Sequence, residues 1–224
     1  MIRWIQLDTA TVPDDGGELR LMQRGDEYSI MSGSIELMNS RLSGSEEALA
    51  TLVSARLGDV SAPSVLIGGY GMGFTLRAAL ASLDARAKVT VAELVPAVVA
   101  WARGPMAEVF GDSLDDVRVK IRETDVGEII RAQRSAFDAI LLDVDNGPEG
   151  LTRKGNNALY NASGLKAAKV ALRPGGVLAV WSSGPNPAFT KRLGSAGFDV
   201  NEVNVRATGR GGGARHVIWI ARRS

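Results

Sequence analysis

Glycine and acidic residues follow three successive apolar segments of the chain, at spacings that suit a nucleoside. Residues 68–73 read Gly-Gly-Tyr-Gly-Met-Gly and follow the apolar run 65–67. Glycines at such a turn let the backbone approach a ligand closely, and a following helix offers free N–H groups. Glu93 ends the second segment, where a carboxylate can accept from both ribose hydroxyls, and Asp125 follows the third, where an acid can accept from an adenine amino group. Each feature alone is typical of a packing turn or a solvated loop, but in this order they predict a nucleoside site.

A fourth apolar run, 138–142, is followed by Asp143, the candidate catalytic residue. Ligands of open α/β folds bind at the carboxyl ends of the strands. A carboxylate there can take up a proton and steady positive charge near a reacting centre. Asp145 and Asn146 follow closely. A calcium-binding loop is excluded because Lys154 stands where the loop needs its closing glutamate. An alternative that stays open is that Asp143 only caps a turn.

These side chains need a parallel sheet to position them, and the rest of the pattern predicts one. From residue 65 onward apolar runs alternate with helical segments, which is typical of an α/β sheet with right-handed crossovers. Strands are expected over 65–67, 89–92, 117–121, 138–142 and 177–181. Helices are expected over 74–83, 96–103, 126–134, 163–172 and 187–196. Two last strands, 198–205 and 215–221, are expected to form an antiparallel hairpin at one side of the sheet.

The start of the chain has a different pattern and is expected to form a small β region. Alternating segments that read as short strands occupy 18–24, 27–31 and 34–38. A helix then opens with Ser45 as its N-cap and runs to Leu57. The predicted division is 1–42 for the β region and 43–224 for the nucleotide-binding, catalytic domain. The first strands, with Trp4, are expected to be an appendage or the contact of a homodimer.

Composition excludes several classes of site. The chain has 26 basic and 25 acidic residues, which removes the electrostatic argument for a nucleic-acid partner. Without cysteine there is no disulfide, thiolate metal site or Cys nucleophile, and with one histidine no His-based metal cluster. That histidine, His216, lies beside an apolar strand and is expected to be structural. No run approaches the roughly 20 apolar residues of a membrane span, and Asp8 comes too early for a signal peptide, so we expect a cytoplasmic protein without a metal.

The sequence resembles the spermidine synthase (polyamine aminopropyltransferase) family, a branch of the class I methyltransferase fold. The resemblance runs over nearly the whole chain. Besides the N-terminal strands and the glycine segment it is carried by Val91-Ala92-Glu93-Leu94-Val95-Pro96, Thr124-Asp125, Leu142-Asp143, Leu159-Tyr160 and Leu172-Arg173-Pro174-Gly175-Gly176-Val177-Leu178. It implies an α/β fold with a Rossmann-like, seven-stranded class I methyltransferase domain and a small N-terminal β region.

The resemblance also implies a donor and a reaction. The donor is an adenosyl sulfonium, either S-adenosylmethionine or decarboxylated S-adenosylmethionine, and a transferase of this kind alkylates a small, amine-bearing acceptor, as in polyamine biosynthesis. The residues expected to bind the donor are Gly68, Gly69, Gly71, Glu93, Leu94, Asp125, Val126 and Asp143. In the family an aspartate at the position of Asp143 takes the proton from the acceptor amine. The residues expected to line the acceptor are Glu36, Glu46, Asp145, Asn146, Tyr160 and Trp181.

Several positions on the acceptor side depart from the family pattern. Gly71 stands where the family has an aspartate that grips the donor's amine, and Asn146 replaces the second aspartate of an Asp-x-x-Asp-Pro motif. Residues 45–47 read Ser-Glu-Glu where the family has Tyr-His-Glu, and Glu36 replaces a glutamine. These departures predict a poor putrescine aminopropyltransferase, and the long loop 146–158 is a candidate lid. Two alternatives stay open: a methyltransferase that acts on another small molecule, and a nucleoside-binding protein without catalysis.

Overall fold

The computed structural model describes residues 2–13, 17–144, 147–148, 157–208 and 213–224 of the chain. Its strands are β1 (Ile5–Thr11), β2 (Glu18–Arg24), β3 (Glu27–Ser32), β4 (Ile35–Asn39), β5 (Ser64–Gly68), β6 (Lys88–Glu93), β7 (Val119–Glu123), β8 (Phe137–Leu142), β9 (Leu172–Ser182), β10 (Phe198–Arg206) and β11 (Arg215–Arg223). Its helices are α1 (Gly44–Leu57), α2 (Phe74–Ser82), α3 (Pro96–Arg103), α4 (Ala107–Phe110), the 3₁₀ turn η1 (Gly111–Leu114), α5 (Val126–Ala132), α6 (Asn157–Tyr160), α7 (Ala162–Ala171) and α8 (Pro187–Ser195). Asp145, Asn146 and most of the candidate lid lie outside the described residues.

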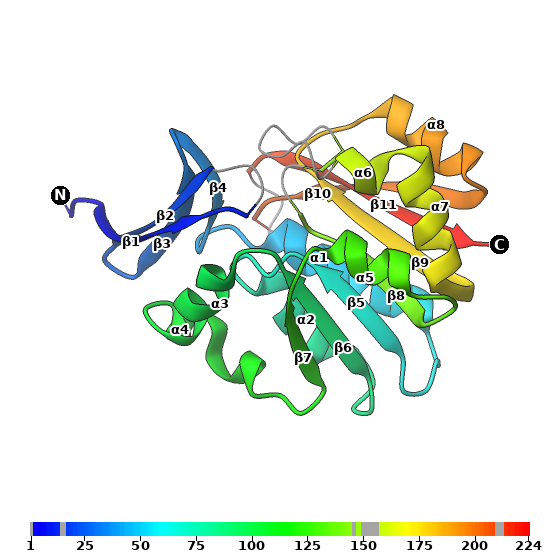
Figure 1. Ribbon diagram of the computed structural model, residues 1–224, viewed down its shortest axis with the longest axis horizontal. Coiled ribbons are helices and arrows are strands. Elements are labelled where there is room, and N and C mark those ends of the chain that lie inside the picture. The colour runs from blue at the N-terminus through cyan, green and yellow to red at the C-terminus, as the bar shows by residue number, and fades with distance from the viewer. Residues whose placement is uncertain (1, 14–16, 145–146, 149–156, 209–212) are drawn as a thin grey trace.

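The strands form two sheets (Figure 1). β1 to β4 pair antiparallel in sequence order, and the predicted division of the chain falls between β4 and α1. The second sheet has the order β10-β11-β9-β8-β5-β6-β7, in which β5 to β9 are parallel. β11 runs antiparallel to both β9 and β10. The predicted α/β fold with a closing antiparallel hairpin is therefore confirmed.

Helices cover both faces of the seven-stranded sheet. Adjacent residues of a strand point to opposite faces, so a continuous apolar run fills a core on each side. On one side α1, α2 and α3 pack against the strand residues Val65, Ile67, Ala139 and Leu141. On the other side α5, α7 and α8 pack against Leu66, Ile140 and Leu142. The loops at the strand ends are thus held by a sheet that is buried on both faces.

β5 is the strand at which the order of the parallel sheet reverses. The chain adds β6 and β7 on one side of it and later adds β8 and β9 on the other. Ligands of open α/β sheets bind outside the carboxyl ends of the strands at this point. Here the N–H of Asp143 donates to the carbonyl of Gly68 at 2.9 Å. A Cβ on Gly69, whose φ is +88°, would overlap the carbonyl oxygen of Asp143, so the two loops meet only because residue 69 is glycine.

Three local expectations were wrong. α1 begins at Gly44 with Ser43 as its N-cap, and the Ser45 hydroxyl bonds to side chains instead of capping the helix. The third strand of the large sheet begins at Val119, because the side chain of Val117 is fully exposed and packs against nothing. The four-residue helices α4 and α6 were not expected, since one turn is too short to show a period.

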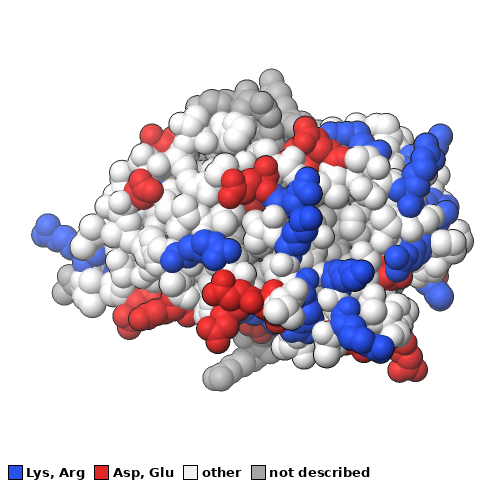
Figure 2. Space-filling view, turned by 60° about the horizontal axis from the view of Figure 1, so that its bottom comes forward, with Lys and Arg blue, Asp and Glu red and all other residues white. Residues whose placement is uncertain are grey.

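The surface carries charges of both signs. Figure 2 shows lysine and arginine side chains close to aspartates and glutamates on the same face of the molecule. This mixture agrees with the balanced charge of the sequence. Among the helices of the described residues, none has the length and apolar character needed to cross a membrane.

Candidate active site

A cavity at the carboxyl ends of β5 to β8 brings most of the predicted donor residues together. It is lined by Gly69, Gly71, Glu93, Leu94, Asp125, Val126 and Asp143. Gly68 lies behind this lining, where a Cβ would come within 2.9 Å of the Val126 side chain. The N-terminal sheet and its loops supply the opposite wall, with Val12, Gly17, Leu19, Ser32, Leu37 and Met38. The cavity therefore lies between the two sheets and combines acids on one side with mainly apolar side chains on the other.

Glu93, at the end of β6, is held by backbone donors. Its Oε2 accepts from the N–H of Tyr70 at 3.0 Å, and its Oε1 accepts from the N–H of Val95 at 2.8 Å. Burial raises the pKa of this carboxyl group, and the backbone hydrogen bonds oppose that effect. Each carboxylate oxygen can accept two hydrogen bonds. Glu93 thus fixes the glycine segment and the start of the following loop at the rim of the cavity.

Asp125 is the N-cap of α5, where its Oδ1 accepts from the N–H of Gly127 at 2.6 Å. The cap places the carboxylate at the first turn of a helix that begins directly after β7 and its short loop. Asp125 also lines the cavity, so one residue serves both the helix and the rim of the site.

A second cavity adjoins the first. The two share Leu37, Met38, Gly71 and Asp143. The remaining lining of the second cavity is mostly apolar or aromatic and consists of Asn39, Glu46, Tyr70, Met72, Phe74 and Trp181. Trp181 is 8% exposed, and its indole N–H has no hydrogen-bond partner among the described residues. Asp143 therefore stands in the wall between a cavity that also contains Glu93 and Asp125 and a second cavity that also contains Glu46.

Asp143 and Glu46 form a pair of acids at this second cavity. The hydroxyl of Thr75 donates to Asp143 Oδ2 at 2.6 Å. Burial, and then the negative charge of Glu46, raise the pKa of Asp143 to about 7, against the effect of the Thr75 bond. Burial also raises the pKa of Glu46, while its bond from Ser45 lowers it. Since two nearby carboxylates disfavour each other's ionisation, the pair is suited to hold a proton or a cation.

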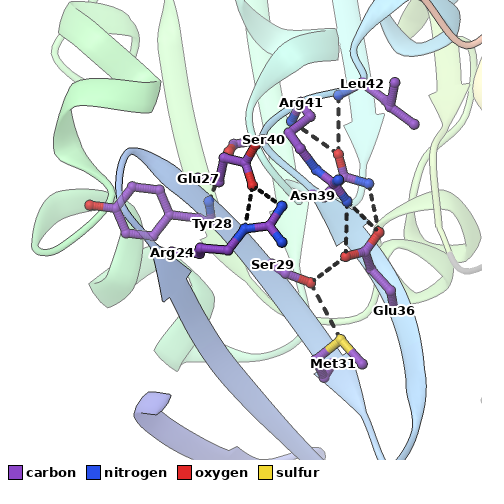
Figure 3. A network of polar contacts seen from close by, with 10 residues as sticks. All are labelled: Arg24, Glu27, Tyr28, Ser29, Met31, Glu36, Asn39, Ser40, Arg41 and Leu42. Carbon is purple, nitrogen blue, oxygen red and sulfur yellow. Dashed lines mark hydrogen bonds and ion pairs between the residues drawn. The ribbon is translucent and has the colours of Figure 1, made fainter. Parts of the chain in front are cut away.

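The structure does not bring Glu36 to these cavities. Its carboxylate accepts from Ser29 Oγ at 2.8 Å and Asn39 Nδ2 at 2.9 Å, and it pairs with Arg41 at 3.4 Å (Figure 3). It lines a separate cavity within the N-terminal sheet, beside Trp4. The pairing of β3 with β4 shifts at Leu37, since Met38 pairs with Ile30 and Glu36 with Met31. This irregularity lets the consecutive residues Leu37 and Met38 both face the site, while Glu36 does not.

Tyr160 is also placed elsewhere. It is 1% exposed and packs edge-on against Phe189 with the ring centres 5.6 Å apart. It lines neither cavity, because α6 turns its ring into the core between the sheet and α8. Of the six residues expected at the acceptor, Glu46 and Trp181 line the second cavity.

Sequence reasoning missed Thr75 and the apolar wall from the N-terminal sheet. Thr75 is the second residue of α2, and no local pattern distinguishes it from a core threonine. The wall residues Leu37 and Met38 belong to a strand whose facing side depends on a register shift between β3 and β4. The positions of Leu37 and Met38 thus depend on pairing between strands, which a single sequence does not display.

Known proteins resemble this chain in sequence and in fold. A family model described as the spermine/spermidine synthase domain matches residues 46–193. Polyamine aminopropyltransferase 1 of Streptomyces coelicolor is 30% identical over 150 residues, which are 63% of this chain and 27% of that protein. A polyamine aminopropyltransferase of Sulfolobus acidocaldarius is 28% identical over 123 residues, 55% of this chain and 39% of that protein. The chain thus matches well under half the length of these curated relatives.

Solved structures share the fold. A spermidine synthase from Thermotoga maritima superposes with a TM-score of 0.77 and 19% identity, covering 98% of this chain and 73% of that one. A spermidine synthase in complex with the transition-state analogue AdoDATO gives a TM-score of 0.75 and 19% identity, and the match covers 98% of this chain and 72% of that one. TrmN from Thermus thermophilus superposes with a TM-score of 0.58 and 23% sequence identity, and the match covers 80% of this chain and 48% of that one. At these identities the likeness shows the fold alone.

We expect Asp143 to make the folded protein less stable as the pH rises from about 4 to about 7. Its pKa is about 7 in the folded chain and near the ordinary 3.8 when unfolded, so the folded state binds the proton more tightly in that window. Asp143→Asn removes this titration, and the variant should gain stability relative to the wild type as the pH rises. Urea denaturation at several pH values measures the difference, with exposed Asp199→Asn as the control. A difference that is constant across the window would contradict a raised pKa.

Proposed function

The chain belongs to the spermine/spermidine synthase family, and from this premise we propose that it is a transferase that alkylates a small amine with an adenosyl sulfonium donor. The observation that carries the proposal is the position of Asp143 in the wall shared by two cavities. One cavity holds Glu93 and Asp125, which suit a nucleoside. The other holds Glu46 and Trp181, which suit an amine with an apolar body.

The residues present fit an adenosyl donor in the first cavity. Glu93 keeps acceptor positions for the ribose, Asp125 suits the adenine amino group, and Leu94 and Val126 add apolar walls. When bound, the donor supplies an alkyl carbon made electrophilic by the adjacent sulfonium. Gly71 offers no acid to the donor's amine, and a Cβ there would already lie 3.2 Å from Met38 Sδ.

Asp143 is the group that prepares the acceptor. A protonated amine has no lone pair, so a base must take its proton before the nitrogen can bond to carbon. Thr75 fixes Oδ2 of the carboxyl group, and the raised pKa of Asp143 suits proton transfer near neutral pH. Leu37 and Met38 line both cavities from the N-terminal sheet and add apolar surface beside the reacting groups.

The second cavity also points to the chemistry of the acceptor. A buried N–H without a partner costs about 1–3 kcal/mol, and the indole N–H of Trp181 is such a group among the described residues. We infer that the acceptor carries a neutral hydrogen-bond acceptor besides its amine. A simple diamine such as putrescine supplies a second cation instead.

Glu93→Ala should weaken binding of the donor by about 1.5–3 kcal/mol, the range for hydrogen bonds to a charged group. Titration calorimetry with decarboxylated S-adenosylmethionine and with S-adenosylmethionine measures it. The matched control is Glu123→Ala, because Glu123 is the exposed neighbour of Glu93 across the β6–β7 pair. Equal affinities for wild type and Glu93→Ala would remove Glu93 from the site.

An acceptor panel tests the reaction. The protein is incubated with each donor and with diamines, polyamines and amino alcohols, and the released methylthioadenosine or adenosylhomocysteine is measured. We expect methylthioadenosine from the decarboxylated donor, with an amino alcohol or a differently shaped polyamine turned over faster than putrescine. Adenosylhomocysteine as the main product would make the protein a methyltransferase. Efficient formation of spermidine from putrescine would contradict the inferred acceptor, and binding without any product would favour a non-catalytic nucleoside-binding protein.

Asp143→Asn should lower turnover of the best acceptor by roughly 10²–10⁴, the usual contribution of a general base. The substitution keeps the size of the side chain and can still accept from Thr75. Donor affinity measured by calorimetry should persist, which separates loss of the base from loss of the fold. Turnover that survives the substitution would leave Asp143 with a turn-forming role only.

A further inference from the structure

A chain of hydrogen bonds leaves the second cavity through the first turn of α1 and ends at His216. The Ser45 hydroxyl donates to Glu46 Oε2 at 2.6 Å. His216 Nδ1 lies 2.9 Å from the same hydroxyl oxygen. Ser45 is completely buried, whereas His216 on β11 keeps partial contact with solvent. The chain therefore connects a carboxyl group in the cavity with a titratable ring near the surface.

We propose that Ser45 and His216 form a proton relay that connects the Asp143–Glu46 pair to solvent. The proposal rests on the proposed function, because alkylation of an amine is what supplies the proton. It assigns a role to the one histidine of the chain and to the serine that does not cap its helix. Both act through Glu46 and are positioning residues, since neither lines the cavities.

The reaction leaves one proton behind. The acceptor ammonium gives a proton to Asp143, and the freed nitrogen lone pair bonds to the donor's alkyl carbon. The carbon–sulfur bond breaks, and its electron pair stays on sulfur, which becomes a neutral thioether. The product amine now carries the positive charge, and the proton remains on Asp143. Asp143 is half-buried and lines both cavities, so donor and acceptor that fill them separate its carboxyl group from solvent. Glu46, which lines the second cavity with it, is the neighbouring group that can take the proton before the next turnover.

A serine hydroxyl suits the next step because it donates one hydrogen bond and accepts others. With Glu46 ionised, Ser45 donates to the carboxylate and accepts from the Nδ1–H of His216, as the geometry allows. Once Glu46 has taken a proton and the ring is in the Nε2–H tautomer, Glu46 donates to Ser45, which donates to the bare Nδ1. As Nδ1 takes the proton, Nε2 releases its own proton to solvent, which gives the Nδ1–H tautomer with Glu46 ionised again. Exchange of ring protons with solvent returns the half-exposed imidazole to the Nε2–H tautomer.

The surroundings hold this path in place. The His216 ring packs edge-on against Trp181, with ring centres 4.9 Å apart and planes at 74°. Glu47 and Arg215 are the charged sequence neighbours of Glu46 and His216, Arg206 lies opposite Arg215 in the β10–β11 pair, and Tyr70 lines the second cavity with Glu46. Arg77 lies over the Phe74 ring, and Arg206 donates to the carbonyl of Gly213. Among the described residues, no other side chain is hydrogen-bonded to the Ser45 hydroxyl or the Glu46 carboxyl group.

A double-mutant cycle that uses the pKa of His216 as its readout tests the connection without an activity assay. Because the chain has one histidine, its imidazole gives a single set of NMR signals whose pH titration yields the pKa. Glu46→Gln removes the negative charge that favours the imidazolium and should lower the pKa of His216 by about one pH unit. In a Ser45→Ala background the same change should have a smaller effect, because the hydrogen-bonded link is lost and only the through-space effect of the charge remains. The control is Ser43→Ala, whose side chain makes no cap bond.

The second arm measures turnover with the best donor and acceptor. Ser45→Ala and His216→Gln should each lower kcat about tenfold or more and leave the KM for the donor unchanged. Glutamine can still donate to Ser45 but cannot be protonated, so it separates a relay from a merely structural contact.

Two results would overturn the relay. One is a pKa of His216 that responds to Glu46→Gln equally with and without Ser45. The other is an active enzyme whose kcat is indifferent to both Ser45→Ala and His216→Gln. If the NMR coupling is present but no donor and acceptor react, the connection stands and the proposed function fails.

Discussion

The close approach of two loops at the reversal point of the parallel sheet is the constraint on which the site depends. The N–H of Asp143 donates to Gly68, and the N–H of Gly69 donates to Ala92, each at 2.9 Å. The loop after β5 is thereby tied to the strands on both sides of it, and no side chain fits at residue 69. Glu93 and Asp143, which are 50 positions apart (143 − 93), therefore line one cavity. Every step proposed for the chemistry needs this juxtaposition.

The two acids owe their different roles to the groups around them. Burial raises the pKa of both residues. At Glu93 the hydrogen bonds from the N–H groups of Tyr70 and Val95 oppose that effect. At Asp143 the charge of Glu46 adds to it, the hydroxyl of Thr75 opposes it, and the pKa is about 7. A carboxyl group with such a pKa can exchange a proton with an amine.

The sequence predicted the sheet and the strand-end acids because both depend on local order. Apolar runs show which strands are buried on both faces, and the residue after each run must lie at the carboxyl edge. Glu36 could not be placed in this way, since the side it faces depends on the register shift between β3 and β4. The contact between Ser45 and His216 joins residues 171 positions apart, and only the position of β11 beside β9 brings them together. Pairing and packing between distant segments thus decide what the local pattern leaves open.

A crystal structure with methylthioadenosine bound tests the central claim, that the two cavities meet at Asp143 around an adenosyl donor. The expected complex has both ribose hydroxyls on the carboxylate of Glu93, the adenine amino group at Asp125 and the sulfur atom beside Asp143. Leu37 and Met38 should cover the ligand from the N-terminal sheet. A ligand bound elsewhere, or one whose ribose makes no contact with Glu93, would contradict the account.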